Sequence, residues 1–315
     1  LLFNTFWIFL GKYLHQHSAF TTPALLSKSY NKYVGYLGAI FLAIILIPVM
    51  YVHMGAEVLR FAFHIPFAVG AIIFILLSAV AIFSGGFQKL VWTDVFLFII
   101  IYGGLITTLC YFYFDANLSK VDPVEFIGPE YRKKPDYLGW WLLALIVFID
   151  PSIHQRLWAS GSENKVRKVM VGSILGWLIF DLLIIGIVMC SRDNVQTHYV
   201  FSIAHALPPV LKYLFIFMLL SVILSTANTY FNITYNNIAF DLLNLKSNSR
   251  LRHWVVIGLM IICFGLVVFV FQQNSVVDIL FRLNPVCISA LFLPFISIFI
   301  TKIKMKGNFV FIQML

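Results

Sequence analysis

Five polar side chains recur at three- and four-residue spacing in the otherwise apolar stretch 209–243. They are Ser221, Ser225, Asn228, Asn232 and Asn236. Residues three and four apart share one face of a helix, so this spacing predicts a polar stripe on an apolar helix. Sodium is a hard cation that takes oxygen ligands, and Ser225 and Thr226 offer two adjacent hydroxyls. The spacing alone leaves a second interpretation open, in which small polar residues pack helices closely or hydrogen-bond across them.

Three carboxylates lie in or next to apolar stretches, where ionisable groups are costly and commonly functional. Asp94 is a candidate cation ligand, or it pairs with Lys89 or caps its helix. Asp181 interrupts an apolar run and must face protein or water. Asp150 precedes Pro151, and this pair predicts a helix break, because proline lacks an N–H and restricts the residue before it. The break is an ordinary helix end or part of a broken helix at a gate.

The composition predicts a membrane protein. Of its 315 residues, 61% are apolar and 11% are charged, whereas a soluble domain is about 45–50% apolar and about 25% charged. Lipid can solvate so much apolar surface, and a water-soluble globule of this size cannot bury it. The net charge of +9 lies in short loops, so we expect no nucleic-acid partner. The four cysteines stand at no metal-ligand spacing and are expected to be free thiols.

Nine apolar stretches are expected to form transmembrane helices, since a membrane helix needs about 20 apolar residues. Six are free of Asp, Glu, Lys and Arg, namely 33–56, 61–88, 95–114, 213–240, 253–277 and 283–301. Three more are partial or irregular, namely 1–11, 137–149 and 169–191. Fourteen of the 22 Lys and Arg residues fall on the side that includes the C-terminal tail. The positive-inside rule therefore places the C-terminus in the cytoplasm.

The longest loop, 115–136, separates four expected helices from five. An inverted repeat of five plus five helices is a recurrent transporter plan. Four plus five fits that plan if one helix is missing at the N-terminus. We therefore expect one transmembrane domain over 1–315, in which 1–114 is the remainder of the first repeat and 115–136 an external loop. The second repeat is expected over 137–301 and a cytoplasmic tail over 302–315.

Four passages resemble signatures of the sodium:solute symporter family, which includes the sodium/proline and sodium/glucose carriers. They are Thr21-Thr22-Pro23-Ala24-Leu25-Leu26 with Tyr30, Ser84-Gly85-Gly86 with Trp92-Thr93-Asp94, Gln155-Arg156-Leu157-Trp158-Ala159-Ser160, and Leu207-Pro208 with Ser225-Thr226-Ala227-Asn228-Thr229 and Asp241-Leu242. Any one of them is common, but their order and their placement on the expected helices are specific. The resemblance extends to about residue 300.

The resemblance implies a LeuT-like fold, an all-α polytopic membrane protein in which this chain supplies helices two to ten of a ten-helix core. The absent first helix would give half of the substrate and ion sites. The resemblance also implies a first sodium site at the Val222 carbonyl, Ser225 and Thr226. A second sodium site would use Asp94 with Ser225, Asn228 and Thr229. The chain departs from the family at Leu97, where Gln is usual, and at Asn228, where Asp or Ser is usual.

The expected function is secondary active transport, with Na⁺-coupled uptake of a small organic solute by alternating access. The run 142–147 is wholly apolar, which favours an amino acid or a carboxylate over a sugar. The alternatives are a transporter-like membrane sensor domain and an inactive truncated carrier. An enzyme is not expected, because the chain shows no metal-ligand cluster and no nucleophile motif. The expected location is a bacterial inner membrane, with sodium, the solute and lipid as partners.

Overall fold

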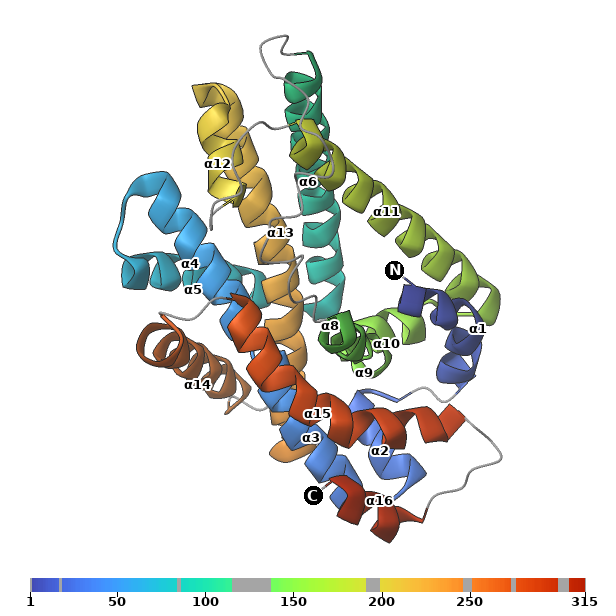
Figure 1. The fold of residues 1–315 in the computed structure, drawn as a ribbon. Helices are drawn as coiled ribbons and strands as arrows, with labels where there is room; N and C mark the ends of the chain where they lie inside the picture. The colour runs from blue at the N-terminus through green and yellow to red at the C-terminus, as the bar shows by residue number, and fades with distance from the viewer. Residues whose placement is uncertain are drawn as a thin grey trace. The chain divides into compact units, whose positions relative to one another are not determined.

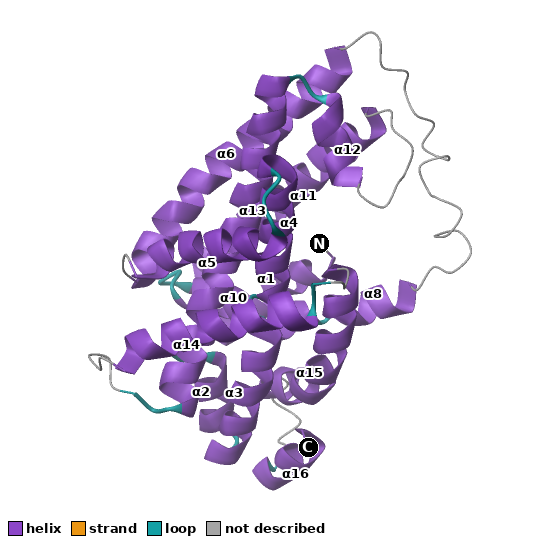
Figure 2. Ribbon diagram, turned by 90° about the vertical axis from the view of Figure 1, so that its left-hand side faces the viewer, coloured by secondary structure: helices purple, strands orange, loops and turns teal. Residues whose placement is uncertain are grey.

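The computed structural model describes residues 2–16, 19–83, 86–114, 137–190, 199–245, 251–272, 276–299 and 306–314. The regular structure in these ranges is helical, and they contain no strand (Figure 2). The predicted external loop 115–136 lies outside the described residues. Of the predicted tail 302–315, the described part contains a short helix, Gly307–Met314.

The helices follow one another along the chain in the order drawn in Figure 1. They are α1 (Leu2–Gln16), α2 (Thr22–Ser29), α3 (Lys32–Leu46), α4 (Val49–Phe63), α5 (Phe67–Phe83), α6 (Gly86–Phe114), α8 (Tyr137–Ala144), α9 (Ile146–Ile149), α10 (Pro151–Trp158), α11 (Glu163–Cys190), α12 (Tyr199–Ala206), α13 (Pro209–Asn236), α14 (Leu251–Gly265), α15 (Val276–Phe299) and α16 (Gly307–Met314). Two π-helical segments continue α13 and α14, namely η1 (Asn237–Leu242) and η2 (Leu266–Val270).

Five helical runs among the described residues are long and apolar enough to cross a membrane. They are Lys32–Phe63, Val91–Phe114, Asn164–Cys190, Pro209–Leu242 and Leu251–Val270. The apolar helices Phe67–Val80 and Asn284–Phe299 are shorter. The described residues thus confirm the all-α class, and these apolar helices agree with a membrane protein. The nine-helix count, the inverted repeat, the particular membrane and the side of the C-terminus stay predictions.

Local backbone chemistry sets helix boundaries that hydropathy alone does not show. Within the apolar stretch 33–56, α3 ends at Leu46 and Ile47 is extended (φ −60°, ψ 122°) before Pro48. Further along, α4 runs on to Phe63, and His64 then adopts a positive φ of 54°. The stretch 33–56 therefore lies in one candidate span, Lys32–Phe63, that is interrupted at Ile47, because a residue before proline is pushed out of the helical region. The expectation that 61–88 forms one helix is wrong, since α4 ends at Phe63 and α5 begins at Phe67, just after Pro66.

The helix break predicted at Asp150–Pro151 is confirmed. Asp150 has an extended backbone (φ −72°, ψ 111°), α9 ends just before it and α10 begins just after it. Its Oδ1 accepts a hydrogen bond from the Ser152 N–H at 2.8 Å. An aspartate at this position satisfies one of the free N–H groups at a helix start, so Asp150 both ends α9 and caps α10.

The chain forms two compact units, which we call the first and the second unit. The first unit comprises Leu1–Val52, Leu138–Leu175 and Thr229–Leu315. The second unit comprises His53–Tyr137 and Gly176–Asn228. The bounds of α4, α11 and α13 each include residues of both units.

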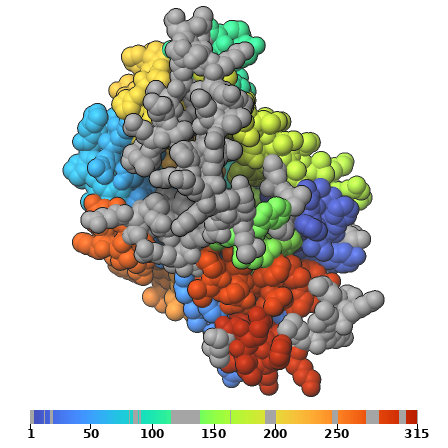
Figure 3. Space-filling model, viewed as in Figure 1, coloured from blue at the N-terminus to red at the C-terminus, as the bar shows by residue number. Residues whose placement is uncertain are grey.

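In the first unit, α3 packs against α2, α15, α16 and η1, and α1 packs against α9, α10 and α15. Figure 1 shows α15 crossing α3, and Figure 3 shows α15 and α16 as one red surface. The fully buried side chains of this core include Trp7, Leu26, Leu42, Leu157 and Phe295. Burying a side chain of this kind contributes about 1.5–3 kcal/mol, so these contacts hold the shorter helices of the unit.

His154 lies at the centre of that core and is fully buried. Its ring stacks on Phe295 with centroids 4.5 Å apart and meets the edge of Trp7 at 5.4 Å. Nε2 is 3.0 Å from the Phe148 carbonyl, and because a carbonyl only accepts, Nε2 carries the proton. Nδ1 therefore accepts from the Thr22 hydroxyl at 2.8 Å. Burial lowers the pKa of His154, in α10 outside the candidate spans, to about 3, so the ring is neutral.

In the second unit, α5 packs against α6, and the core includes Leu105, Phe112, Ile187 and Met218. Tyr102 of α6 donates a hydrogen bond to the Gly176 carbonyl of α11 at 2.8 Å. The outer face of α11 exposes large apolar side chains, among them Trp177, Ile179 and Leu182, each more than half exposed. A lipid bilayer is the solvent that suits such a face.

We expect Gly70→Ala to destabilise the protein, because its Cβ would lie 2.9 Å from the Ala56 carbonyl oxygen and 3.3 Å from the Ala56 Cα. Backbone atoms cannot move aside as a side chain can, and overpacking of this kind costs about 1–3 kcal/mol. Gly103→Ala is the matched control, since nothing lies within 4 Å of its added Cβ and alanine gains up to about 1 kcal/mol of helix propensity. Thermal unfolding in detergent should give opposite shifts, and equal shifts would contradict the packing.

We expect the stability of the first unit to fall as the pH is lowered from about 6.5 towards 3. An unfolded histidine takes up a proton near pH 6.5, whereas folded His154 resists it until about pH 3. The contribution is thus complete above pH 6.5 and is lost progressively below it, by up to about 1.4 kcal/mol per pH unit. His154→Gln should flatten this part of the pH profile of thermal unfolding. If the melting temperatures of His154→Gln and of the unchanged protein fall equally steeply with pH, the folded protein binds the proton on His154 as readily as the unfolded chain does.

Candidate functional site

The candidate site in the second unit centres on a hydrogen bond between two apolar helices. The Ser225 hydroxyl of α13 donates to Oδ1 of Asp94 of α6, with 2.6 Å between the oxygens. Both residues are half-buried and lie within the candidate spans Val91–Phe114 and Pro209–Leu242. A hydrogen bond to an ionised acceptor is short and strong. The structure thus brings together two predicted ligands that are 131 positions apart in the sequence.

Both hydroxyls of the predicted first sodium site, those of Ser225 and Thr226, donate hydrogen bonds within the protein. Ser225 donates to Asp94, and Thr226 donates to the Val222 carbonyl one turn earlier, at 3.0 Å. A hydroxyl oxygen has two lone pairs besides its proton, and a carbonyl oxygen has two lone pairs. Ser225 and Thr226 therefore keep lone pairs that a cation can use. The Val222 carbonyl accepts both the Thr226 hydroxyl and the N–H four residues later in α13, so its two lone pairs are already used.

Asn228 adds a buried amide oxygen to the same helix. It is 1% exposed, and its Oδ1 has no hydrogen-bond partner among the residues that the structure describes. Residues three apart on a helix are neighbours on its surface, so Asn228 lies beside Ser225. An unsatisfied buried acceptor costs about 1–3 kcal/mol, and a cation or a water bound there would remove that cost.

Thr229, a predicted ligand of the second sodium site, belongs to the first unit. Its hydroxyl accepts a long hydrogen bond from Arg156 Nη2, at 3.5 Å. Its part in a sodium site with Asp94 stays a prediction. The alternative role of Asp94, a pair with Lys89, involves a side chain outside the described residues.

Two further carboxylates, Asp150 and Asp181, have neighbours that the sequence did not reveal. Oδ2 of Asp150 accepts from the Tyr230 hydroxyl at 3.1 Å, within the first unit. In the second unit, Asp181 is half-buried and interacts electrostatically with Tyr102. Sequence reasoning missed these partners, because the aromatic residues stand among many others with no spacing that marks them.

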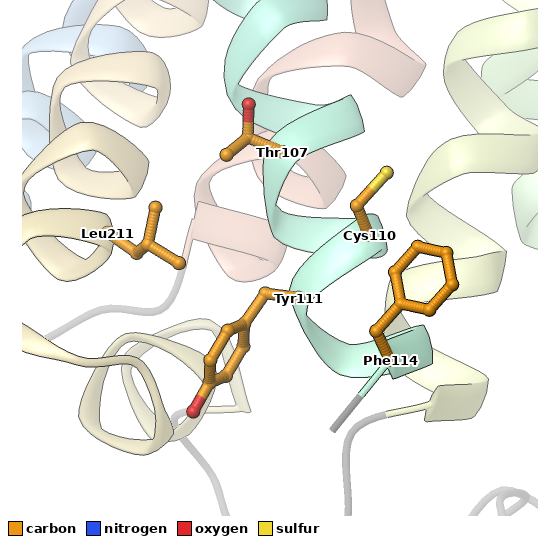
Figure 4. Close-up of a pocket in the computed structure, with 5 residues that line it drawn as sticks. All are labelled: Thr107, Cys110, Tyr111, Phe114 and Leu211. Atoms are coloured by element: carbon orange, nitrogen blue, oxygen red, sulfur yellow. The ribbon is translucent and has the colours of Figure 1, made fainter. Parts of the chain in front are cut away.

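A pocket in the second unit has a volume of about 430 Å³. Figure 4 shows its lining side chains, four from α6 and Leu211 from α13. They are Thr107, Cys110, Tyr111, Phe114 and Leu211. None of the predicted ligands lines this pocket, and its walls are mostly apolar. It therefore offers no set of ligands for an ion.

Comparison of the sequence with protein-family models and with the curated proteins gave no match. Among the described residues, no three His, Cys, Asp or Glu side chains are grouped as a transition-metal site requires. The groups that the described residues bring together here, namely the Asp94 carboxylate, the Ser225 hydroxyl and the Asn228 amide oxygen, are oxygen donors. Oxygen donors suit hard cations such as sodium, so the arrangement is a candidate sodium site.

Proposed function

We propose that this chain is the transport domain of a sodium-coupled symporter that takes up a small organic solute. The observation that carries the proposal is the Asp94–Ser225 hydrogen bond between two apolar helices, beside the unpartnered oxygen of Asn228. Ionisable groups at membrane depth commonly mark ion pathways. The order of the motifs around these residues, which resembles the sodium:solute symporters, supports the same function.

The charge balance favours one sodium ion at this place. Asp94 supplies a negative charge, and Ser225 and Asn228 supply neutral oxygens, a donor set that suits a monovalent hard cation. Neutralising a partly buried carboxylate removes a large desolvation cost. Thr226 provides a further hydroxyl oxygen one turn from Val222, at the first sodium site that the resemblance implies. Sodium and the solute are both cargo in this mechanism.

The coupling energy is sufficient for useful accumulation. At 100 mV, one sodium ion contributes about 2.3 kcal/mol of electrical driving force. A tenfold sodium gradient adds about 1.4 kcal/mol. At about 1.4 kcal/mol per factor of ten, the two together allow roughly 500-fold accumulation with one ion per solute. We propose an amino acid or a carboxylate as the solute, because the run Leu142–Val147 offers no polar side chain to bind sugar hydroxyls.

We expect proteoliposomes that contain the chain to take up solute only under an inward sodium gradient. The probes are the amino acids and a panel of small carboxylates, each tested with sodium chloride against choline chloride. Asp94→Asn and Ser225→Ala should each reduce sodium-dependent uptake at least tenfold, because each removes a ligand worth about 1.4 kcal/mol or more. Thr107→Ala is the matched control. It removes a hydroxyl that bonds only the Gly103 carbonyl of α6 and should leave uptake unchanged.

Two outcomes would contradict the proposal. Uptake that does not depend on sodium, or that survives Asp94→Asn with the same sodium dependence, would remove the ion from this site. Sodium binding without any uptake would refute transport and favour the sensor alternative. Sodium binding is measured directly with radioactive sodium at constant ionic strength.

A further inference from the structure

The first unit contains a small buried cavity that is separate from the Asp94 site. Its volume is about 10 Å³, which is the space of one water molecule or one small ion. It lies among α2, α3, α10, the end of α13 and η1. Its lining residues are Thr21, Thr22, Pro23, Leu42, Leu46, Pro151, Gln155, Ile233 and Asn237. The polar members of this lining offer hydroxyl and amide groups and carry no charge.

Asn237 presents an unpartnered oxygen at this cavity. The residue is 2% exposed, and its Nδ2 donates to the Ala39 carbonyl at 2.8 Å. That bond fixes the orientation of the Asn237 amide. Rotating the amide by 180° would place Oδ1 against the Ala39 carbonyl oxygen, and both of these atoms are acceptors. Oδ1 is therefore held on the other side, where it has no hydrogen-bond partner among the described residues.

The hydroxyl protons of Thr21 and Thr22 are both used in hydrogen bonds, so these groups can act only as acceptors towards a further ligand. Thr21 donates its proton to Oδ1 of Asp241 at 2.8 Å. Thr22 donates its proton to Nδ1 of His154, since Nε2 of that ring already donates to Phe148. Both threonines are more than nine-tenths buried. The Thr21 oxygen also accepts the Ala24 N–H at 3.2 Å, as the cap of α2, and keeps one lone pair. The Thr22 oxygen keeps its lone pairs. These lone pairs are the ones that a cation can use.

Asp241 brings a negative charge next to the cavity. Oδ1 accepts from Thr21, which lines the cavity, while Oδ2 is buried and has no hydrogen-bond partner in the described part of the chain. Asn237 and Asp241 both belong to η1, and in its i→i+5 bonding pattern residues four and five apart lie nearly above one another. A buried carboxylate without a compensating charge is strongly unfavourable.

We propose that this cavity holds one sodium ion, bound by oxygens of Thr21, Thr22, Asn237 and Gln155 beside the Asp241 carboxylate. One carboxylate balances one monovalent cation. A divalent cation would keep an excess positive charge, and Ca²⁺ takes six to eight oxygen ligands, more than this lining offers. The π-helical turn fits the assignment, because such turns are rare and recur at functional sites. The inference stands independently of transport and of the Asp94 site.

The test counts sodium ions on the full chain in detergent by equilibrium binding of radioactive sodium. N-methyl-D-glucamine chloride holds the ionic strength constant. In the Asp94→Asn background we expect one bound sodium per chain, and adding Asp241→Asn should abolish it. Gln155→Leu should weaken the remaining binding about tenfold, a usual effect of losing a group that holds or orients a metal ligand. Gln155 is half-exposed, so this variant tests the site even if the Asp241 variant does not fold.

Asp150→Asn is the matched control in the same unit. Its carboxylate already accepts from Tyr230 and Ser152, and the change removes the same charge, so the sodium count should stay at one. No sodium bound in the Asp94→Asn background would mean that the cavity holds an internal water only, and would overturn the inference. A count unaffected by Asp241→Asn would overturn it as well. A wild-type count of one that Asp241→Asn abolishes and Asp94→Asn leaves unchanged would uphold this inference while refuting the proposed coupling site.

Discussion

A carboxylate within an apolar helix bundle must be compensated where it lies, because neither lipid nor a packed core solvates a charge. Three carboxylates of this chain accept hydrogen bonds from hydroxyl groups. Asp94 accepts from Ser225, Asp150 from Tyr230, and Asp241 from Thr21. A hydroxyl stabilises a negative charge but does not neutralise it. These pairs position helices, and those of Asp94 and Asp241 lie at the two cation sites that we propose.

The choice of hydroxyl partners has a functional consequence. An arginine or lysine would neutralise the carboxylate permanently, and breaking such a buried pair is costly, so a sodium ion could not replace it. A serine or threonine keeps its lone pairs after it donates its proton. The Ser225 hydroxyl that joins α6 to α13 thus keeps lone pairs for the sodium ion that we propose. Asp150 differs, because its second oxygen caps α10, and its two donors leave it a structural role at the helix break.

Some of this arrangement follows from the sequence alone, and some of it does not. Composition predicts the membrane class, and the Asp150–Pro151 pair predicts its own helix break, because both effects are local. The end of α3 before Ile47 is also a local effect. The Pro48 next to it predicts this helix end, whereas the length of the apolar run does not. The partners of Asp94 and Asp241 lie 131 and 220 positions away, and no spacing rule links such residues. The resemblance to the symporters supplied the Asp94 site, whereas it assigned no role to Thr21 or Asp241.

Polar side chains continue along the run Pro209–Leu242 beyond the stripe from Ser221 to Asn236. Ser225 and Asn228 stand at one part of the run Pro209–Leu242, and Asn237 and Asp241 stand near its end. In each pair the asparagine has a buried oxygen without a hydrogen-bond partner in the described residues, and a carboxylate is bonded to a hydroxyl of the same cluster. Helix packing alone would be served as well by alanine or glycine, which carry no polar group to satisfy. Repeated orphan oxygens beside repeated carboxylates are therefore better explained by cation binding than by packing.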